Sequence, residues 1–564
     1  MMTKTHLQKS NQPSDTKKII YLVIICTGFY VLSLIRLNNI YFQVIFFAYL
    51  LAVFIYILGK NWLSQLNPKK IDKILVLSII IFSILFSLIS IVRHNQYLSH
   101  AYDLGLFSQV IWNYSRYGIG DSAIRGFTNI FGDHLSPILV LFAPLYRIWS
   151  DPRLLLICQA IIVSLAVWPL YHIAKNKISH IGALFLSLAY LSYCGVGFAV
   201  KFDFHEIILF PALFLFSLYF FEKKRYFLYF IFVILMFMVK ENIAVYLGFF
   251  SIYLFFRSKK IAIITLLLSI GYYILATKYI IPHFSGGNSG YFLFSAFGAN
   301  EIDALKNIFL HPFHLINVAT DNLQKNDTIL AIFGSFGFLI FFCPNFILIA
   351  LPMLAEQVLY DIPTHWAIYY HYSIAIAPIL ALGTICAMKR IANARYILAQ
   401  KIKNIEVFLF LSIFVLCSSL VITLVQRAPL VTFFTPSFYR DYPWTLDIDK
   451  LIAEIPAYAS VGAQDNIVPH ISARKYVTGY PLVRDSRMTS PEYYIFSAQG
   501  SYYPLTTQCE EMRQIGSIFA KSDYGLFLRF GDAYLFKINY RDDISQKEGL
   551  DHLKKTDLTC TIDQ

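Results

Sequence analysis

The stretch ILVLSIIIFSILFSLISIVR, residues 74–93, decides the fold class of this chain. It is apolar around the whole circumference of a helix, and serine is its only polar residue type before Arg93. Its length matches the roughly 20 residues that a helix needs to cross the hydrocarbon core of a bilayer. The sequence therefore predicts a transmembrane helix at this position.

Comparable apolar runs follow one another along the chain as far as residue 426. Several are shorter than a perpendicular helix requires, so 226–256 and 327–360 are each expected to form either short hairpins or a single bent segment. No small-residue cleavage pattern follows the first run, which is therefore expected to remain as an anchor. The thirteen expected spans are 19–35, 40–58, 74–93, 154–175, 180–200, 206–221, 226–239, 242–256, 261–281, 327–342, 345–360, 372–388 and 405–426.

The composition agrees with a membrane protein. Apolar residues make up 57% of the 564 residues, and charged residues only 14%, against about 25% in typical soluble chains. A soluble fold of this size cannot bury 51 Phe and 39 Tyr without far more polar surface. The composition therefore excludes soluble globular, disordered, collagen-like and coiled-coil chains.

The net charge of +13 comes from the membrane part. Residues 427–564 hold 15 basic and 17 acidic residues, which leaves 32 basic and 17 acidic residues for 1–426. The excess lies in short runs between apolar spans, as the positive-inside rule predicts for cytoplasmic loops, so nucleic-acid binding is a poor explanation. These runs share one side of the thirteen-span arrangement, which is therefore predicted to be cytoplasmic. Their basic residues are Lys60, Lys69, Lys70, Lys73, Lys175, Lys177, Lys223, Lys224, Arg225, Arg257, Lys259, Lys260, Lys389, Arg390, Arg395, Lys401 and Lys403.

This orientation divides the chain into three regions. We expect a cytoplasmic N-terminal tail at 1–18, an all-α transmembrane domain at 19–426 and a domain outside the membrane at 427–564. Within the transmembrane domain, 94–153 and 282–326 are expected to be long outer loops.

The C-terminal region is expected to form a small α/β domain. A helix is expected to end near 452–455, residues 459–463 are typical of a buried strand, and 524–538 are typical of a hairpin with a two-residue loop. Cys509 and Cys560 are the only cysteines in this region, and they can pair if the compartment is oxidising. Their spacing leaves that pairing open.

The sequence contains no P-loop, glycine-rich dinucleotide turn, paired CxxC or HExxH motif. Candidate chemistry lies instead in ionisable groups at the outer ends of apolar spans, where a charge is costly and usually has a purpose. The first is Asp103 in YDLGLFSQ, residues 102–109, which opens an amphipathic helix that Gly118 can end. Asp103 is either a helix cap or a carboxylate placed to accept a proton from an incoming hydroxyl.

The second group closes the same outer loop in FGDHLSP, residues 131–137. Asp133 and His134 can together bind a metal, orient a nucleophile or hold a phosphate. The structural alternative is helix capping by Ser136 with Pro137 at the first helical position. Both interpretations can hold, because the capping pair does not use Asp133 or His134.

Two further groups share the predicted outer face. Lys and His side chains there can hold a phosphate or pyrophosphate, and Asp203, Glu206 or His365 can ligate a divalent ion. A single charged pair at such a turn is as often a snorkelling or paired group as a ligand. The residues are Lys201, Asp203, His205 and Glu206 with Lys240 and Glu241 at two turns, then Asp361, His365, Tyr369, Tyr370 and His371.

These motifs carry a resemblance that covers nearly the whole chain. YDLG and Gln109, FGDH with Ser136-Pro137, FDFHE at 202–206, Lys240-Glu241 and the tail segment from 455 to 474 resemble a bacterial family of multi-spanning membrane proteins of unknown function. That family is similar in plan to the GT-C glycosyltransferases. The resemblance implies about eleven to thirteen spans, an acidic residue in a long first outer loop and an outer C-terminal domain.

The resemblance also implies a function. Enzymes of this plan transfer a sugar from a polyprenyl phosphate or pyrophosphate carrier outside the cytoplasmic membrane, so a polyprenyl-phosphate sugar donor is the expected partner. Asp103 takes the place of the catalytic acid of the first loop, although many members place two acids close together there. The expected catalytic residues are Asp103, Asp133 and His134, the expected substrate-binding residues are Gln109, Lys201, His205, Lys240, His365 and His371, and the candidate metal ligands are Asp203 and Glu206.

Two other function classes remain open. One is a transporter or flippase of a lipid-linked or amphiphilic substrate, although we find no internal repeat in the sequence and the ionisable groups favour span ends over the midplane. The other is a membrane-anchored protein whose outer domain binds the cell envelope.

Overall fold

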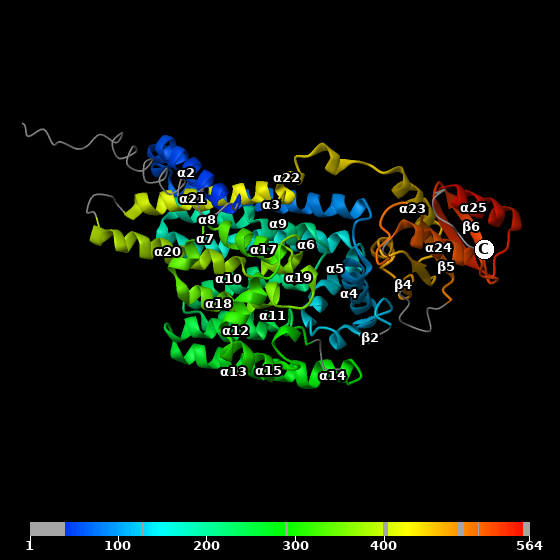
Figure 1. Ribbon diagram of the computed structural model, residues 1–564, viewed down its shortest axis with the longest axis horizontal. Helices are drawn as coiled ribbons and strands as arrows, with labels where there is room; N and C mark the ends of the chain where they lie inside the picture. Colours follow the sequence, from blue (N-terminus) through cyan, green and yellow to red (C-terminus); the bar gives the residue numbers. More distant parts are fainter. Residues whose placement is uncertain are drawn as a thin grey trace, which may run out of the picture.

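The computed structural model describes residues 40–126, 128–287, 292–398, 404–481, 490–505 and 507–556. The expected first span at 19–35 and Cys560 lie outside these residues. The described chain forms a bundle of apolar helices with a C-terminal domain at one end (Figure 1). We call this end of the bundle the domain end. The last turn of α20 (Ala377–Leu398) and the first turn of α21 (Asn404–Val425) lie at the opposite end (Figure 1).

Within the described residues, six helical segments are long and apolar enough to cross a membrane, and a seventh is obtained if one bent pair counts as a single span. The bent pair is α8 (His180–Ser192) with α9 (Cys194–Lys201), which meet at 45°. The six segments are α2 (Ile40–Ser64), α3 (Pro68–Asn95), α6 (Arg153–Leu165) with α7 (Val167–Ile178), α13 (Lys259–Leu275) with α14 (Ile281–Phe284), α20 (Ala377–Leu398) and α21 (Asn404–Val425).

The other apolar runs form shorter helices. The stretches 226–256 and 327–360 each contain two short helices, which agrees with the hairpin alternative for both. A disulfide between Cys343 and Cys386 joins the second stretch to α20. The short helices are α10 (Phe210–Glu222), α11 (Tyr226–Phe237), α12 (Ile243–Phe255), α17 (Leu323–Gly334) and α18 (Pro344–Val358).

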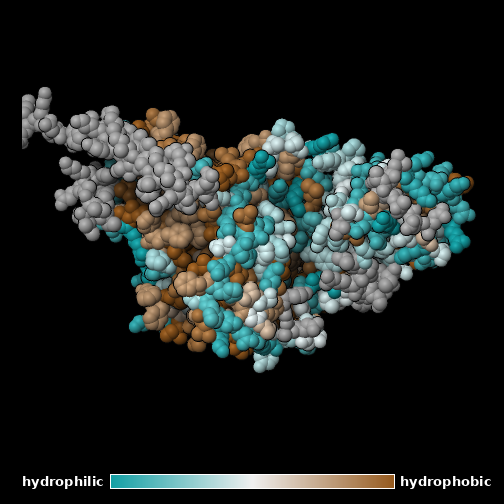
Figure 2. Space-filling model, in the orientation of Figure 1, coloured by the Kyte–Doolittle hydropathy of each residue, from teal (hydrophilic) through white to brown (hydrophobic). Residues whose placement is uncertain are grey.

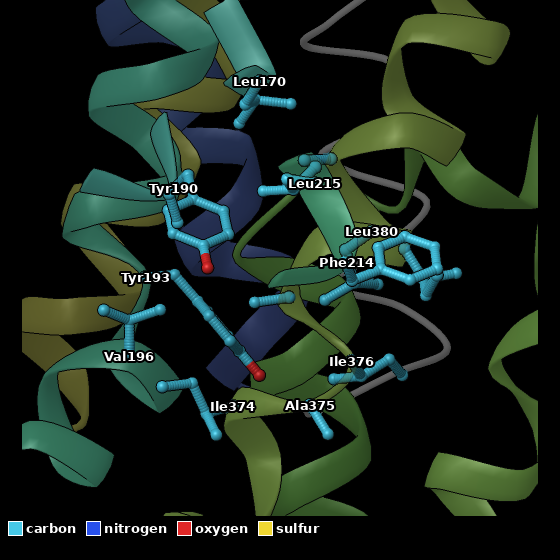
Figure 3. Packing of buried hydrophobic residues seen from close by; sticks show 14 of the residues in the cluster. Leu170, Tyr190, Tyr193, Val196, Phe214, Leu215, Ile374, Ala375, Ile376 and Leu380 are labelled. Carbon is cyan, nitrogen blue, oxygen red and sulfur yellow. The ribbon is translucent and has the colours of Figure 1, made fainter. Parts of the chain in front are cut away.

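The bundle is apolar both inside and outside. Figure 3 shows Tyr190 and Tyr193 pointing toward apolar side chains such as Leu215 of α10 and Ile376, which directly precedes α20, within one continuous core. In the most apolar windows of α2 and α3, only 22% of residues are buried inside the protein, and the exposed ones are mainly Ile, Leu, Val and Phe. Figure 2 shows hydrophobic surface gathered over the bundle and away from the C-terminal domain. An outward apolar surface of this size needs lipid around it, so the chain is a multi-pass membrane protein.

The first long loop packs against the domain end as a set of short elements. The predicted amphipathic helix is confirmed as α4 (Leu106–Tyr117), and Gly118 ends it with a positive φ of 72°. A π-helical turn at Ala101–Gly105 precedes α4 and carries Asp103. Pro137 begins a 3₁₀ turn as predicted, but the Ser136 side chain makes no capping hydrogen bond. The remaining elements are β1 (Asp121–Ser122), β2 (Thr128–Asn129) and α5 (Ala143–Ile148).

The C-terminal domain is α/β, as predicted. Its five-stranded sheet has the order β4-β3-β5-β7-β6. Strands β4, β3 and β5 run parallel to one another, β7 runs antiparallel to β5, and β6 runs antiparallel to β7. The predicted hairpin is confirmed, because Phe530 pairs with Ala533 across the two-residue loop. The elements are α23 (Pro443–Ala453), β3 (Val461–Ala463), β4 (Val477–Gly479), β5 (Tyr493–Ser497), α24 (Gln508–Phe519), β6 (Tyr524–Phe530), β7 (Ala533–Ile538) and α25 (Asp543–Thr556).

Candidate functional site

Asp103 pairs with a histidine from a distant part of the chain. Its carboxylate lies 3.1 Å from Nε2 of His205, which follows α9 in the turn at 202–205. The Asp103 side chain is 26% exposed and that of His205 only 11%, so the carboxylate forms the accessible side of this pair. The residue that caps α4 is Gly105, and Asp103 is therefore free of the capping role that the sequence allowed. An exposed carboxylate beside a buried imidazole is an arrangement suited to proton transfer.

His205 links Asp103 to the segment 361–371. Its ring stacks on that of His371 with centroids 3.6 Å apart, and Phe202 lies beside both rings. Burial opposes protonation of His205, but the hydrogen bond and charge of Asp103 outweigh it and raise the pKa of this imidazole above its usual value. His205 therefore keeps its proton to higher pH than an ordinary histidine.

A second set of charges joins the loop residue His134 to the turn between α11 and α12. Lys240 pairs with Glu206 at 3.3 Å, and Glu241 accepts from His134 Nδ1 at 2.9 Å and from the Leu135 N–H at 3.1 Å. Burial alone would raise the pKa of Glu241, but His134 and Lys240 lower it to about 2. Burial would likewise lower the pKa of Lys240, yet Glu206 and Glu241 raise it. The site therefore carries ionised Glu241 and protonated Lys240 at neutral pH.

Further cations lie at the end of α3 and of α9. The Arg93 guanidinium pairs with Asp203, a fully buried carboxylate that also accepts from the His100 N–H at 2.7 Å. Lys201 is half-buried, and among the described residues it has no acidic partner. A half-buried ammonium without a carboxylate is suited to an anionic group supplied from outside the chain.

Several buried polar atoms around Lys240 lack a partner. They are Glu206 Oε2, Asn242 Oδ1, His365 Nδ1 and His371 Nδ1. His365 stacks on Tyr372 at 3.6 Å, and burial together with the charge of Lys240 lowers its pKa to about 3. Because buried polar atoms in folded proteins are nearly always hydrogen-bonded, this group indicates a place where water or a ligand makes polar contacts.

The two candidate metal ligands are engaged elsewhere. Asp203 binds Arg93, and Glu206 binds Lys240. In the part of the chain that the structure describes, no group of three or more His, Cys, Asp or Glu side chains is arranged to hold a metal ion. Each of these two carboxylates therefore has a cation of the chain as its partner.

Two other predicted site residues have structural partners. Asp133 forms an ion pair with Arg125 of the same loop, so it stands beside His134 in sequence but has a different partner. Gln109 is fully buried, accepts from Ser122 Oγ and the Ile124 N–H, and donates to the carbonyls of Arg474 and Lys475. These bonds leave Gln109 no polar atom for a substrate, and its role is to join α4 to the C-terminal domain.

Sequence reasoning missed the contacts that hold the Asp103 turn. Asp465 of the C-terminal domain accepts from His100 Nδ1 at 2.7 Å and from the Ala101 N–H at 3.1 Å, just before Asp103. The His470 ring stacks on His94 and Tyr97 of the transmembrane domain, at 4.0 and 3.8 Å. The tail motif around 464–474 was visible in the sequence, but no local pattern shows which surface it contacts.

Replacing Asp465 by Asn is expected to loosen the Asp103 turn. The carboxylate accepts two bonds, and losing a charge-assisted bond costs about 1.5–3 kcal/mol. Amide hydrogen exchange at Ala101, measured by mass spectrometry on the purified protein, should therefore become at least about tenfold faster. The matched control is Asp532→Asn, which removes a similar bond to His552 within the C-terminal domain and should not alter exchange at Ala101. Unchanged exchange at Ala101 in the Asp465 variant would show that this carboxylate does not hold the turn.

Comparison with known proteins gives one family and several similar structures. A family model described as "Predicted membrane protein (DUF2079)" matches residues 93–524. No curated protein gives a significant match. The chain is similar to ArnT from Cupriavidus metallidurans bound to undecaprenyl phosphate, with a TM-score of 0.49 and 11% identity over 82% of this chain and 97% of that one.

Two further structures are similar at lower scores. For ArnT from Cupriavidus metallidurans in the apo state, the TM-score is 0.41, with 10% identity over 80% of this chain and 97% of that one. For the Archaeoglobus fulgidus oligosaccharyltransferase tethered to an acceptor peptide, the TM-score is 0.33, with 10% identity over 73% of this chain and 64% of that one.

Proposed function

The chain belongs to the DUF2079 family of predicted membrane proteins, and we propose that it is a glycosyltransferase that takes a sugar from a polyprenyl-phosphate-linked donor. The observation that carries the proposal is the partly exposed Asp103 carboxylate, paired with His205. The same end of the bundle carries Lys201, Lys240 and Arg93. Transfer from a lipid-linked phosphate donor requires a base for the acceptor hydroxyl and cations for the phosphate, both beside helices that face lipid.

In this proposal Asp103 acts as the general base. It accepts the proton of an acceptor hydroxyl, and the hydroxyl oxygen forms a bond to the anomeric carbon of the donor sugar. The bond from that carbon to the phosphate oxygen breaks, and the phosphate leaves with the electron pair. Lys201, which has no carboxylate partner among the described residues, and protonated His205 stabilise the charge that develops on the leaving phosphate.

The proposal includes an orientation. The domain end would face the outside of a bacterial cytoplasmic membrane, with the N-terminus in the cytoplasm, because the basic runs of the sequence favour the opposite side. The donor tail would remain among the lipids while its phosphate reaches Lys201 and Lys240. Asp133 and His134 would complete the site from the first loop, His134 through its bond to Glu241.

The direct test is cleavage of a carrier-linked sugar. Purified protein in detergent is given a polyprenyl-phosphate sugar with a radiolabelled sugar and an extract of envelope glycans as the acceptor. A transferase releases free polyprenyl phosphate and moves the label into the acceptor fraction. A transporter or an envelope-binding protein leaves the donor intact, and that result would refute the proposal.

The rate of transfer should fall at alkaline pH. The hydrogen bond and charge of Asp103 raise the pKa of His205, so its imidazole keeps the proton to higher pH than an ordinary histidine and loses it as the pH rises through that elevated value. In the variant His205→Gln the amide donor does not titrate, and the alkaline limb of kcat/KM should disappear while the overall rate is lower. The measurement is a pH profile between about 5 and 9. If His205→Gln showed the same decrease of kcat/KM at alkaline pH as the unsubstituted protein, the decrease would belong to another titrating group that faces the site, such as His371, and not to His205.

A further inference from the structure

We propose that the helical hairpin formed by α15 (Glu301–Leu310) and α16 (Pro312–Thr320) lies in the membrane interface at the domain end, with one apolar face among the lipid acyl chains. The hairpin joins α14, the end of a membrane-spanning segment, to α17. This inference does not depend on the transfer reaction.

Each helix of the hairpin has an outward apolar face. On α15, Ile302, Leu305 and Phe309 recur at helical spacing, and Phe309 is 81% exposed. On α16, Phe313 is 80% exposed and Ile316 is also exposed. Side chains of this size rarely stand together in water. The hairpin therefore presents a continuous apolar surface that another apolar phase must cover.

A different face of the hairpin packs on the protein. Ala304 is buried in a small cluster with Phe297, Val358 and Leu359, and Ile308, Leu315 and Val318 pack against the same cluster. Each helix therefore already packs on the protein through one side, and its exposed apolar residues lie on a different side. This arrangement leaves the outward side for a separate partner.

The third face is polar. On α15 it carries Asp303 and Lys306, both exposed, and Asn307. An open cavity of about 800 Å³ lies where the two helices meet, and its lining combines polar and apolar side chains, among them Asn307, His311, His314 and Asn317 with Leu310 and Phe313. Helices with a protein-facing side, an apolar side and a polar side fit a position at the bilayer surface, where the apolar side meets acyl chains and the polar side meets water.

The position of the hairpin in the chain favours lipid as the occupant. The preceding span, α13 with α14, exposes a row of Ile, Leu and Tyr side chains to its surroundings, and only 28% of its most apolar window is buried. The hairpin thus continues an apolar surface that already belongs to the membrane-spanning part. The turn just before the hairpin, whose Phe297 packs with Ala304 of α15, is bonded to the segment 361–371, because Asp361 accepts from Ser295 at 2.8 and 3.0 Å.

This connection gives the hairpin a role in positioning residues 361–371. Residues 361–371 contain His365 and His371, and Ser295 holds the start of that segment next to the hairpin. The depth of the hairpin in the interface would therefore set the height of these histidines above the acyl chains. Phe284 of α14 also contacts Phe131 of the first loop, which links the end of this membrane-spanning segment to the loop that carries His134.

The test is a measurement of depth by electron paramagnetic resonance. Phe309→Cys and Phe313→Cys are labelled with a nitroxide in the full-length protein, which is placed in vesicles of phosphatidylethanolamine and phosphatidylglycerol at about 3:1. Oxygen, which concentrates in lipid, is expected to relax both labels several-fold more strongly than a water-soluble nickel chelate. Unsubstituted protein labelled in parallel corrects for the native thiols, which in the described part of the chain are Cys158, Cys194 and Cys417.

The matched controls are Asp303→Cys on α15 and His314→Cys on α16, exposed polar positions roughly 100° or more around each helix from Phe309 and Phe313, where the nickel chelate should act more strongly than oxygen. Equal or stronger nickel relaxation at Phe309 and Phe313 would overturn the proposal by placing the face in water. Protection of these two labels from both reagents would also overturn it, because a protein partner or a second copy would then cover the face. Leu305→Cys and Ile316→Cys, on the same apolar faces, provide a second pair in which the same oxygen preference is expected.

Discussion

Replacement of Asp103 by Asn is expected to lower the rate of sugar transfer by about 10²–10⁴-fold while the protein remains folded. The amide keeps the shape of the side chain and can still contact His205, but it cannot accept the proton of the acceptor hydroxyl. The side chain is partly exposed, so its substitution should cost little stability. The measurement is kcat for release of polyprenyl phosphate, with size-exclusion elution as the check of folding.

Two further variants serve as comparisons for Asp103→Asn. Asp103→Glu keeps the carboxylate but moves it by one methylene group, so a loss of roughly 10²-fold is expected. Asp447→Asn breaks an exposed ion pair with Lys450 in the C-terminal domain and is expected to leave transfer unchanged. Full activity of Asp103→Asn would remove the base assignment. It would not by itself refute transfer, which the donor-cleavage assay tests separately.

Removing one member of the Glu206–Lys240 pair should destabilise the protein more than any other single charge change discussed here. Glu206 is 1% exposed, so Lys240→Met would leave a buried carboxylate without its nearest cation. Breaking such a pair costs about 3–5 kcal/mol, whereas replacing both partners by neutral groups is often close to neutral. Lys240→Met and Glu206→Gln should therefore each lower the thermal unfolding midpoint in detergent, and the double variant should recover most of the loss.

The exposed pair Asp447–Lys450 again supplies the matched comparison. Its single variants, Asp447→Asn and Lys450→Met, should change stability by at most about 1 kcal/mol. If the double variant at Glu206 and Lys240 were as unstable as the sum of its single variants, the two side chains would not act as a pair. The double variant is also informative for transfer, because it restores the fold without restoring the Lys240 cation. Its KM for the donor should stay high if Lys240 holds the phosphate.

Local sequence patterns predicted the elements well. Gly118 was expected to end the helix of the first loop, and it does so with a positive φ. The hairpin at 524–538 was expected from two alternating runs around Gly531-Asp532, and the structure pairs these strands. Such features depend on a few neighbouring residues, since a turn, a cap or an apolar run is recognised within its own stretch of chain.

The pairing of charges was not predictable in the same way. The sequence shows that His134, His205 and Lys240 sit near the ends of apolar segments, where each needs a partner. It does not show that His134 contacts Glu241 or that His205 contacts Asp103. Gln109 illustrates the consequence, because a polar residue in a motif was assigned to substrate although the C-terminal domain covers it.

The sequence by itself determined that this chain crosses a membrane repeatedly and that a small α/β domain follows. Apolar runs and turn residues act over a few positions, so they are readable along the chain. Only the tertiary structure decided that Asp465 and His470 of the last domain hold the turn that carries Asp103. The physical reason is that a buried charge requires a partner, whereas the identity of that partner depends on which distant segments the packed helices bring together.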